Sequence, residues 1–351
     1  MRVLALLLLS AAQPAFADDG NKPRSVRIYQ DWAVGCDNRK FCTAVGLSVN
    51  DRRAINVSVT RERGDESWPK LIVDMELLPP MRLQIDDYRF PDARMWQSKL
   101  RLENKYARNI IRLLAKGRVL SGITYDKREM ASQSLMGLTA ALEYMDRRQL
   151  RINSPTAIVR PGNTTEMYLT TDYSVELRRP PASNLPPSSP IRAALSKYLK
   201  AGECESEDSS ENVSDSHRLD ESHTLLMLSN ECVGGAYNKG TLALIIDGSG
   251  NISPARFDYD PGMAGEDSSS SLSNGYWNLE KRWLETTVLT RSTGDCGRRR
   301  NFVWDGAMFK LAIQEDMPQC RGSKTFIRTF TADIIDEIPK PPKPVSKCKI
   351  P

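Results

Sequence analysis

The sequence predicts a mainly β protein of the α+β class, built from two antiparallel β-rich domains that are sandwich-like or barrel-like. Many short runs alternate apolar and polar residues, which is typical of half-buried strands. Turn sequences such as residues 247–251 (DGSGN) separate these runs. Proline cannot donate to a sheet ladder, so the proline-rich residues 180–190 predict an extended linker between the domains. The 351 residues also exceed the ~150 that one domain usually holds.

The N-terminus predicts export from the cytosol. Arg2 precedes an apolar run at residues 3–9, and Ala15, Phe16 and Ala17 form a small-x-small cleavage site, so residues 1–17 are expected to be a signal peptide. The apolar run is much shorter than the ~20 residues of a membrane span. We therefore expect a periplasmic protein of a Gram-negative bacterium that does not span the membrane, and we exclude cytosolic, ATP-driven chemistry.

The first domain is expected over residues 18–179, as a sheet with one or two helices. Alternation predicts strands at residues 26–29, 54–60, 71–75 and 82–85. Two sets of apolar residues recur at helical spacing, and Ser134 is expected to cap the second helix. The sets are Tyr106, Ile110, Ile111 and Leu114, and then Leu135, Leu138, Leu142 and Met145.

The second domain is expected over residues 191–335. Ser189 and Pro190 favour a short helix over residues 191–200, and the acidic, serine-rich residues 203–222 predict a solvated loop or loose hairpin. The rest predicts an antiparallel meander, followed by a flexible tail at residues 336–351. Its strands are expected at residues 224–228, 241–247, 252–259, 277–278, 283–290, 301–304 and 308–314.

Seven cysteines in an exported chain predict disulfides. Cys36 and Cys42 can be a metal clamp, a redox pair or a staple between two strand ends. Zinc sites and thiol-exchange sites favour C-x2-C spacing, which the sequence lacks, so the staple is preferred. Several pairings of the first six cysteines are possible. Proximity along the sequence and the local strand pattern favour the pairs Cys36–Cys42, Cys204–Cys232 and Cys296–Cys320. Cys348 is left over in the tail, where it can pair between chains.

Several residues are candidates for ligand binding. The net charge of +5 comes from 49 basic and 44 acidic residues, which indicates a mixed surface and does not favour nucleic acid. An arginine run can bind an anionic glycan or lipid head group, or can form a charged turn at a hairpin. Aromatic residues can line a ligand face together with Tyr276, Trp277 and Trp283, or can pack in the core. The candidates are Arg298, Arg299, Arg300, Tyr237 and Trp304.

No convergent catalytic set is evident in the sequence. His217 and His223 can form a weak metal site with Asp215, Asp220 and Glu221, but solvated loop histidines are the preferred interpretation. The sequence has no nucleophile elbow and no phosphate-binding loop followed by a helix, so we expect no metal and no cofactor. Acidic residues between 258 and 271 can in principle serve glycosidic cleavage. These are Asp258, Asp260, Glu266 and Asp267.

Several motifs in order resemble the exported bacterial "domain of unknown function 1176" family. They are residues 31–38 (DWAVGCDN) with Cys42, residues 134–149 (SLMGLTAALEYMDRRQ), residues 232–238 (CVGGAYN), residues 294–297 (GDCG), residues 303–306 (VWDG) and residues 320–322 (CRG). The N-terminal half is also similar to the invasion-associated locus B family of small exported β proteins. It shares the Trp-x-x-x-Cys strand and the LLPP passage, but it has residues 88–91 (YRFP) where that family has a second cysteine pair. The resemblance implies a β fold and an exported protein, and it supplies no catalytic residues.

The sequence therefore predicts an exported, disulfide-stabilised periplasmic protein that is not an enzyme and that binds an envelope component or a protein partner. A narrower version is an inhibitor or accessory factor that inserts a loop into another enzyme. The alternative is an envelope hydrolase that uses the carboxylates of residues 258–271.

Overall fold

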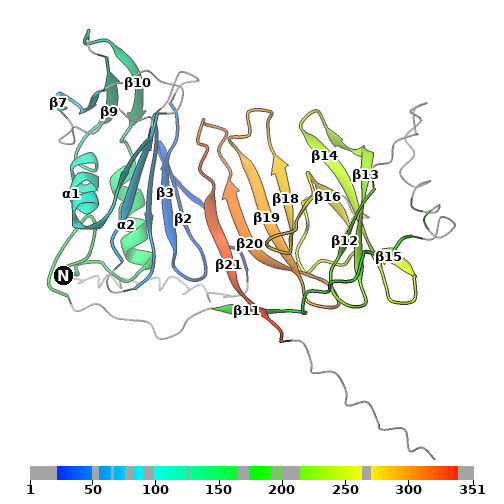
Figure 1. Ribbon diagram of the computed structural model, residues 1–351. Coiled ribbons are helices and arrows are strands. Elements are labelled where there is room, and N and C mark those ends of the chain that lie inside the picture. Colours follow the sequence, from blue (N-terminus) through cyan, green and yellow to red (C-terminus); the bar gives the residue numbers. More distant parts are fainter. Residues whose placement is uncertain are drawn as a thin grey trace, which may run out of the picture.

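The computed structural model describes residues 22–49, 55–64, 67–75, 82–89, 99–124, 126–164, 174–190, 195, 198, 214–262 and 270–338. Most of these residues lie in antiparallel strands, and they form two halves placed side by side (Figure 1). The structure confirms the mainly β class that the alternating pattern predicts. The expected signal peptide, Cys204 with the side chain of Cys232, and Cys348 fall outside the described residues, so the structure does not bear on the Cys204–Cys232 pairing.

The first half is built around a six-stranded antiparallel sheet. In spatial order its strands are β1 (Arg27–Tyr29), β2 (Trp32–Cys36), β3 (Cys42–Gly46), β4 (Asn56–Arg61), β5 (Lys70–Asp74) and β8 (Lys99–Leu102). A smaller sheet contains β10 (Glu129–Ser134), β9 (Val119–Ile123), β6 (Arg82–Ile85) and β7 (Tyr88–Arg89). Helices α1 (Asn104–Leu114) and α2 (Leu138–Arg148) pack against one face of the large sheet and complete its core.

Helix α2 forms because its apolar residues recur every three or four positions and meet one face of β2. Leu138, Leu142 and Met145 are fully buried there beside Trp32. The expected cap at Ser134 is wrong, because Ser134 ends β10 and the residue before the helix is Gly137, with φ 95°. A Cβ at residue 137 would lie 1.9 Å from the Tyr29 carbonyl oxygen, so only glycine fits this turn.

The second half consists of two sheets packed face to face. One holds β11 (Val175–Arg179), β21 (Ile327–Asp336), β20 (Phe309–Met317), β19 (Gly297–Trp304), β18 (Trp283–Leu289) and β17 (Tyr276–Asn278), in that order. The other holds β12 (Ser214–Arg218), β13 (Thr224–Gly235), β14 (Asn238–Ile246) and β15 (Ile252–Pro254), with β16 (Ser271–Ser273) also paired to β14. Buried Phe302, Trp304 and Phe309 of the first sheet meet Leu225 and Ile245 of the second, which makes this half a sandwich.

The region that opens the second half matches part of the sequence-based expectation. Leu195 and Tyr198, the described residues of the expected helix at 191–200, are helical and pack on the outer face of β13 and β14. The Tyr198 hydroxyl donates to the Ile252 carbonyl oxygen at 3.1 Å. Within the expected loop or hairpin at residues 203–222, β12 forms an antiparallel hairpin with β13.

Two strands of the second half depart from the sequence-based assignment. The first domain was expected to end at residue 179, but β11 pairs in parallel with β21 and its Val175 and Leu177 pack on the second core. The predicted meander ended at residue 314, and β21 is a further strand that it missed. Because β21 is the strand that also meets the first half, its omission hides the junction between the halves.

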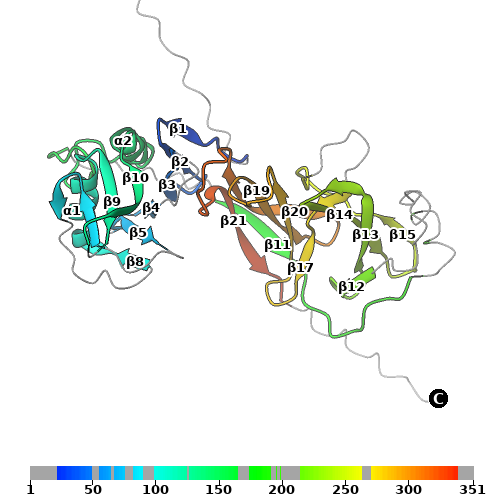
Figure 2. The same cartoon turned by 90° about the horizontal axis from the view of Figure 1, so that it is seen from above.

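The junction depends on strands β2 and β3, in which every residue is buried. Side chains on one face, such as Trp32 and Val34, belong to the first core. On the other face, Ala33 and Val45 pack against Met317 at the end of β20, and also against Cys296, Phe326 and Ile327. Figures 1 and 2 show β2 and β3 beside β21 in both views. The two halves thus share a third, smaller core.

Close approach at this junction requires glycine at position 35. A Cβ there would lie 2.7 Å from the Ile327 Cγ2 atom. We expect Gly35→Ala to lower the free energy of unfolding by about 1–3 kcal/mol, because overpacking forces the two halves apart. Gly235→Ala is the matched control, since a Cβ at that strand residue meets nothing within 4 Å. Urea denaturation measures the stability of both variants. Equal stability of Gly35→Ala and wild type would contradict the packing at this junction.

Candidate binding site at the junction of the two halves

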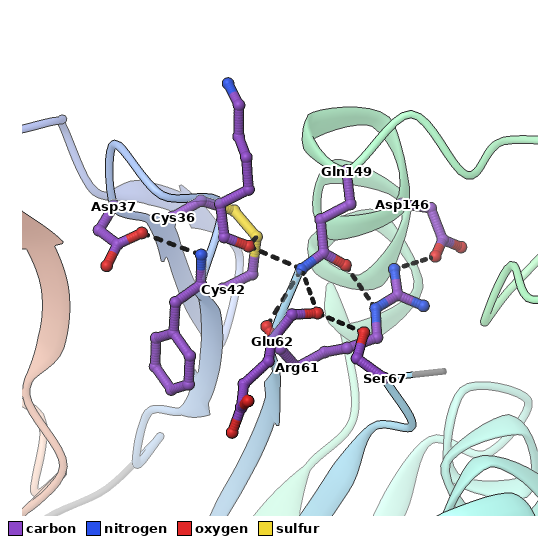
Figure 3. Close-up of a disulfide and its surroundings, with 10 residues drawn as sticks. Cys36, Asp37, Cys42, Arg61, Glu62, Ser67, Asp146 and Gln149 are labelled. Atoms are coloured by element: carbon purple, nitrogen blue, oxygen red, sulfur yellow. Dashed lines mark hydrogen bonds and ion pairs between the residues drawn. A yellow bond between two sulfur atoms is a disulfide. The ribbon is translucent and has the colours of Figure 1, made fainter. Parts of the chain in front are cut away.

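A disulfide closes the ladder between β2 and β3. It joins Cys36 to Cys42, which face each other as the last residue pair of that ladder. Of the three interpretations of these cysteines, the structure has the staple between strand ends, and Figure 3 shows the bond at the base of the turn formed by residues 37–41. The turn is therefore held by a covalent link and projects toward the second half.

A buried polar cluster between this turn and α2 supports the turn (Figure 3). The Arg61 side chain is fully buried and its Nη2 lies 2.7 Å from the Asp146 carboxylate. Gln149 accepts a hydrogen bond from Arg61 and donates Nε2 to the Lys40 carbonyl oxygen at 2.7 Å. The cluster ties α2 to the turn, because Asp146 is in the helix and Gln149 is its C-cap. A buried charge such as Arg61 needs such partners to offset its desolvation.

The turn contacts the second half through Asp37 and Asn38. The Asn38 side chain donates Nδ2 to the Thr331 carbonyl oxygen at 2.9 Å and accepts the Thr331 amide at 2.9 Å. The Thr331 hydroxyl donates to the Asp37 carboxylate at 2.8 Å. Burial raises the pKa of the Asp37 carboxyl, and the hydrogen bonds from Thr331 and the Phe41 amide oppose that rise. The side-chain amide of Asn38 thus pairs with β21 as a neighbouring strand would.

The second disulfide, Cys296–Cys320, lies on the other side of the junction, where both sulfur-bearing residues contact the shared core. The adjacent Asp295 carboxylate lies 2.6 Å from Arg291 Nη2 and accepts the Gly322 amide at 2.6 Å. The Arg291 hydrogen bond, together with those from Thr293 and Gly322, holds the pKa of this carboxyl far below its usual range. Asp295 therefore organises the loops that carry the disulfide.

Arg321, next to that disulfide, connects the two halves directly. Its Nη2 lies 2.6 Å from the Asp31 carboxylate and its Nε donates to the Ser48 carbonyl oxygen at 2.7 Å. The Ser48 amide in turn donates to the Arg321 carbonyl oxygen at 2.7 Å. The motifs around Cys36, Cys296 and Cys320 thus all contribute residues to the contact between the two halves.

A surface cavity of about 320 Å³ opens beside the junction, on the outer face of the sheet that contains β18 to β21. The Arg328 guanidinium borders it and lies 5.2 Å from the centre of the Phe41 ring in the β2–β3 turn. Ligand sites favour such boundaries between domains. The cavity lining consists of Lys281, Trp283, Glu285, Thr286, Thr287, Arg299, Asn301, Ile313, Glu315 and Arg328.

The candidate arginines do not converge, because they lie on a strand and so alternate between its faces. The expected charged turn is wrong, since all three residues belong to β19. Arg298 donates to Asp316 at 2.6 Å, and the buried Arg300 donates to Gln314 at 2.8 Å. Of the three, Arg299 alone lines the cavity, where its guanidinium lies 4.0 Å from the centre of the Phe326 ring.

The other aromatic candidates are placed elsewhere. Trp304 is 3% exposed, packs in the second core and donates Nε1 to Asp220 at 2.7 Å. Tyr237 is at a hairpin tip and donates its hydroxyl to the Thr290 carbonyl oxygen at 3.0 Å. Trp277 is also buried, whereas Trp283 borders the cavity. Of the residues that the sequence pointed to for ligand binding, Arg299 and Trp283 thus line the cavity. The sequence analysis misses Glu285, Glu315 and Arg328, whose signal is the outward-facing position that alternation gives them on β18, β20 and β21, and it misses Lys281, which lies in the turn before β18.

The histidines have structural partners. His223 Nδ1 lies 2.9 Å from the Asp220 carboxylate, and His217 Nε2 lies 2.8 Å from Asp215. The His217 ring stacks on Trp277, with 5.8 Å between ring centres. Within the described ranges, no group of three or more His, Cys, Asp or Glu side chains is arranged to hold a metal ion.

The carboxylates of the alternative hydrolase hypothesis are only partly described, because Glu266 and Asp267 fall outside the described residues. Asp258 accepts the Leu311 amide at 2.8 Å, and burial raises the pKa of its carboxyl. Asp260 accepts the Gly262 amide at 2.9 Å. Neither residue lines the cavity beside the junction.

Comparison with known proteins gives the family. The family described as "Protein of unknown function (DUF1176)" matches residues 26–331. The chain belongs to this family. The DUF1176 chain is also similar to the uncharacterized protein YpfG of Escherichia coli (strain K12), with 24% identity over 324 residues that cover 84% of this chain and 88% of YpfG.

Among solved structures, the chain is similar to invasion associated protein B from Bartonella henselae, with a TM-score of 0.25 and 19% identity. The match covers 36% of this DUF1176 chain and 99% of that protein. The match of the DUF1176 family to residues 26–331 confirms the resemblance to that family noted from the motifs. Among the described helices of the DUF1176 chain, none is both long and apolar enough to cross a membrane.

The low pKa of Asp295 predicts a pH-dependent contribution to stability. A carboxyl whose pKa is lower in the folded than in the unfolded chain stabilises the fold above about pH 4, and this contribution is lost as the pH falls. We expect Asp295→Asn to reduce the free energy of unfolding by about 2 kcal/mol at pH 7, because Arg291 and the Gly322 amide lose their charged acceptor. The difference from wild type should shrink as the pH falls from about 5 to about 2.

Urea denaturation at a series of pH values measures this difference. Asp87→Asn is the matched control, because Asp87 is exposed and makes no side-chain hydrogen bond to the described part of the chain. A stability difference for Asp295→Asn that stays constant between pH 7 and pH 2 would rule out the proposed role of its charge.

Proposed function

We propose that this chain is an exported, disulfide-stabilised periplasmic protein that binds an envelope component or protein partner without turnover. The apolar run at residues 3–9 with its small-x-small site supports export. The disulfides Cys36–Cys42 and Cys296–Cys320 support an oxidising compartment, because cytosolic thiols are kept reduced.

One observation carries the binding role: the cavity opens beside a junction that two disulfides brace. The turn containing Phe41 is held by Cys36–Cys42, and Phe41 stacks under Arg328 at the cavity border. The strand containing Arg299 begins one residue after Cys296. A ligand bound there meets a surface whose shape is fixed in advance, which lowers the entropic cost of binding.

Export and pairing are testable on protein recovered from cells. We expect the periplasmic fraction to contain a chain that begins at Asp18, with both described disulfides formed and resistant to alkylation without reductant. Mass spectrometry of intact protein and of non-reduced peptides measures this. Recovery of the uncut chain in the cytosol, with Cys36 and Cys320 alkylated, would contradict export.

Binding is tested by retention of molecules from periplasmic extract. We expect wild type to retain a partner or envelope fragment at a stoichiometric level, and Asn301→Trp to lose it, because the larger side chain fills the cavity. Ser249→Trp is the control, since Ser249 lies in an exposed hairpin turn away from the cavity. Turnover of added cell-wall fragments without any retained molecule would refute the non-catalytic binding role.

A further inference from the structure

We propose that the cavity beside the junction binds a monoanionic sugar, meaning a hydroxyl-rich ring that carries one carboxylate, and that Arg299 binds this carboxylate. The proposal rests on the binding function proposed above and names the ligand class of the same site. It is carried by the partners of Arg299, by the charge of the lining and by the mixture of polar and apolar groups around it.

Arg299 differs from its neighbours on β19 in lacking an acidic partner. Arg298 is bonded to Asp316 at 2.6 Å, and Arg300 is buried against Gln314 and Asp260. Among the described residues, no carboxylate lies within ion-pair distance of the exposed Arg299. Its guanidinium instead stacks over Phe326 at 4.0 Å, which restricts the group while its in-plane N–H donors remain able to meet an anion.

The cross-strand neighbours of Arg299 do not neutralise it. It is paired in register with Thr287 on one side and Glu315 on the other. The Glu315 carboxylate lies 3.7 Å from Arg328 Nη2, on the following strand. Arg328 is therefore engaged by Glu315, whereas Arg299 has no acidic partner among the described residues.

The charge of the lining favours a single negative charge on the ligand. Lys281, Arg299 and Arg328 face Glu285 and Glu315, so three cations against two carboxylates leave one positive charge. A phosphate dianion would meet repulsion from both glutamates, whereas one carboxylate matches the excess.

The remaining lining suits hydroxyl groups, which both donate and accept hydrogen bonds. Glu285 is a fixed acceptor, because it is held by Trp283 Nε1 at 2.7 Å and Asn278 Nδ2 at 2.9 Å. Asn301 adds a donor and an acceptor, while Trp283 and Ile313 supply apolar surface. The volume of about 320 Å³ is at the small end for ligand sites, which indicates one or two rings.

The test is calorimetric titration of the full purified protein with D-glucuronate, D-glucose and D-glucose 6-phosphate as probes. We expect D-glucuronate to bind about tenfold or more tightly than D-glucose, because one charge-assisted hydrogen bond contributes at least that factor. It should also bind more tightly than D-glucose 6-phosphate, because Glu285 and Glu315 repel the second charge of the phosphate. Arg299→Gln should weaken D-glucuronate binding by about tenfold or more.

Arg298→Gln is the matched control, with the same charge change one residue away on the opposite face of β19, and it should leave the dissociation constant within about twofold. Glu315→Gln should strengthen binding of D-glucose 6-phosphate, because it removes one repulsive charge. Thermal melts of each variant verify that the fold is intact.

Equal affinity of wild type and Arg299→Gln for D-glucuronate would overturn the assignment of Arg299. Absence of D-glucuronate binding to wild type, or tighter binding of the phosphate sugar, would overturn the ligand class. In either case, retention of another partner that Asn301→Trp abolishes would leave the proposed function standing. If wild type binds no D-glucuronate and also retains no partner that Asn301→Trp abolishes, the proposed binding function is contradicted as well.

Discussion

The structure depends on the packing of the β2–β3 hairpin between two cores. One face of the hairpin buries Trp32 and Val34 in the first half, and the other face meets Ile327 and Met317 of the second half. Small residues on the second face, Ala33 and Gly35, allow this approach. Because each face of the β2–β3 hairpin packs against one half, separating the halves would expose a buried apolar face of the hairpin. We therefore expect the halves to hold a fixed relative position. The cavity beside the junction takes its shape from that position.

Two asparagines complete the sheets where strands end. An edge strand leaves amide and carbonyl groups without a ladder partner. β11 begins its pairing with β21 at Ala332, and the Asn38 side chain pairs with both backbone groups of Thr331, the preceding residue. Asn238 does the same for Leu289 at the end of β18, at 2.8 and 2.9 Å. Both asparagines belong to motifs that resemble the family, which gives those motifs a structural explanation.

Much of the first sheet could be predicted from the sequence, because alternation reports which residues face a core. The staple at Cys36 and Cys42 also follows, since close cysteines at two strand ends have little choice of partner. The site could not be predicted in the same way. Alternation does not say which strand lies beside which, so the pairing of β11 with β21 was hidden. The arginine run seemed a single site only while its strand was unassigned, because a strand sends Arg299 to one face and Arg298 to the other.

The central claim is that the junction makes the two halves one cooperative unit. Differential scanning calorimetry of the purified, oxidised protein tests this most directly. The account predicts a single transition whose calorimetric and van't Hoff enthalpies agree, as for a unit that unfolds in one step. Two separated transitions, each with the enthalpy of one half, would contradict it, because they would show that each half is stable without the shared core.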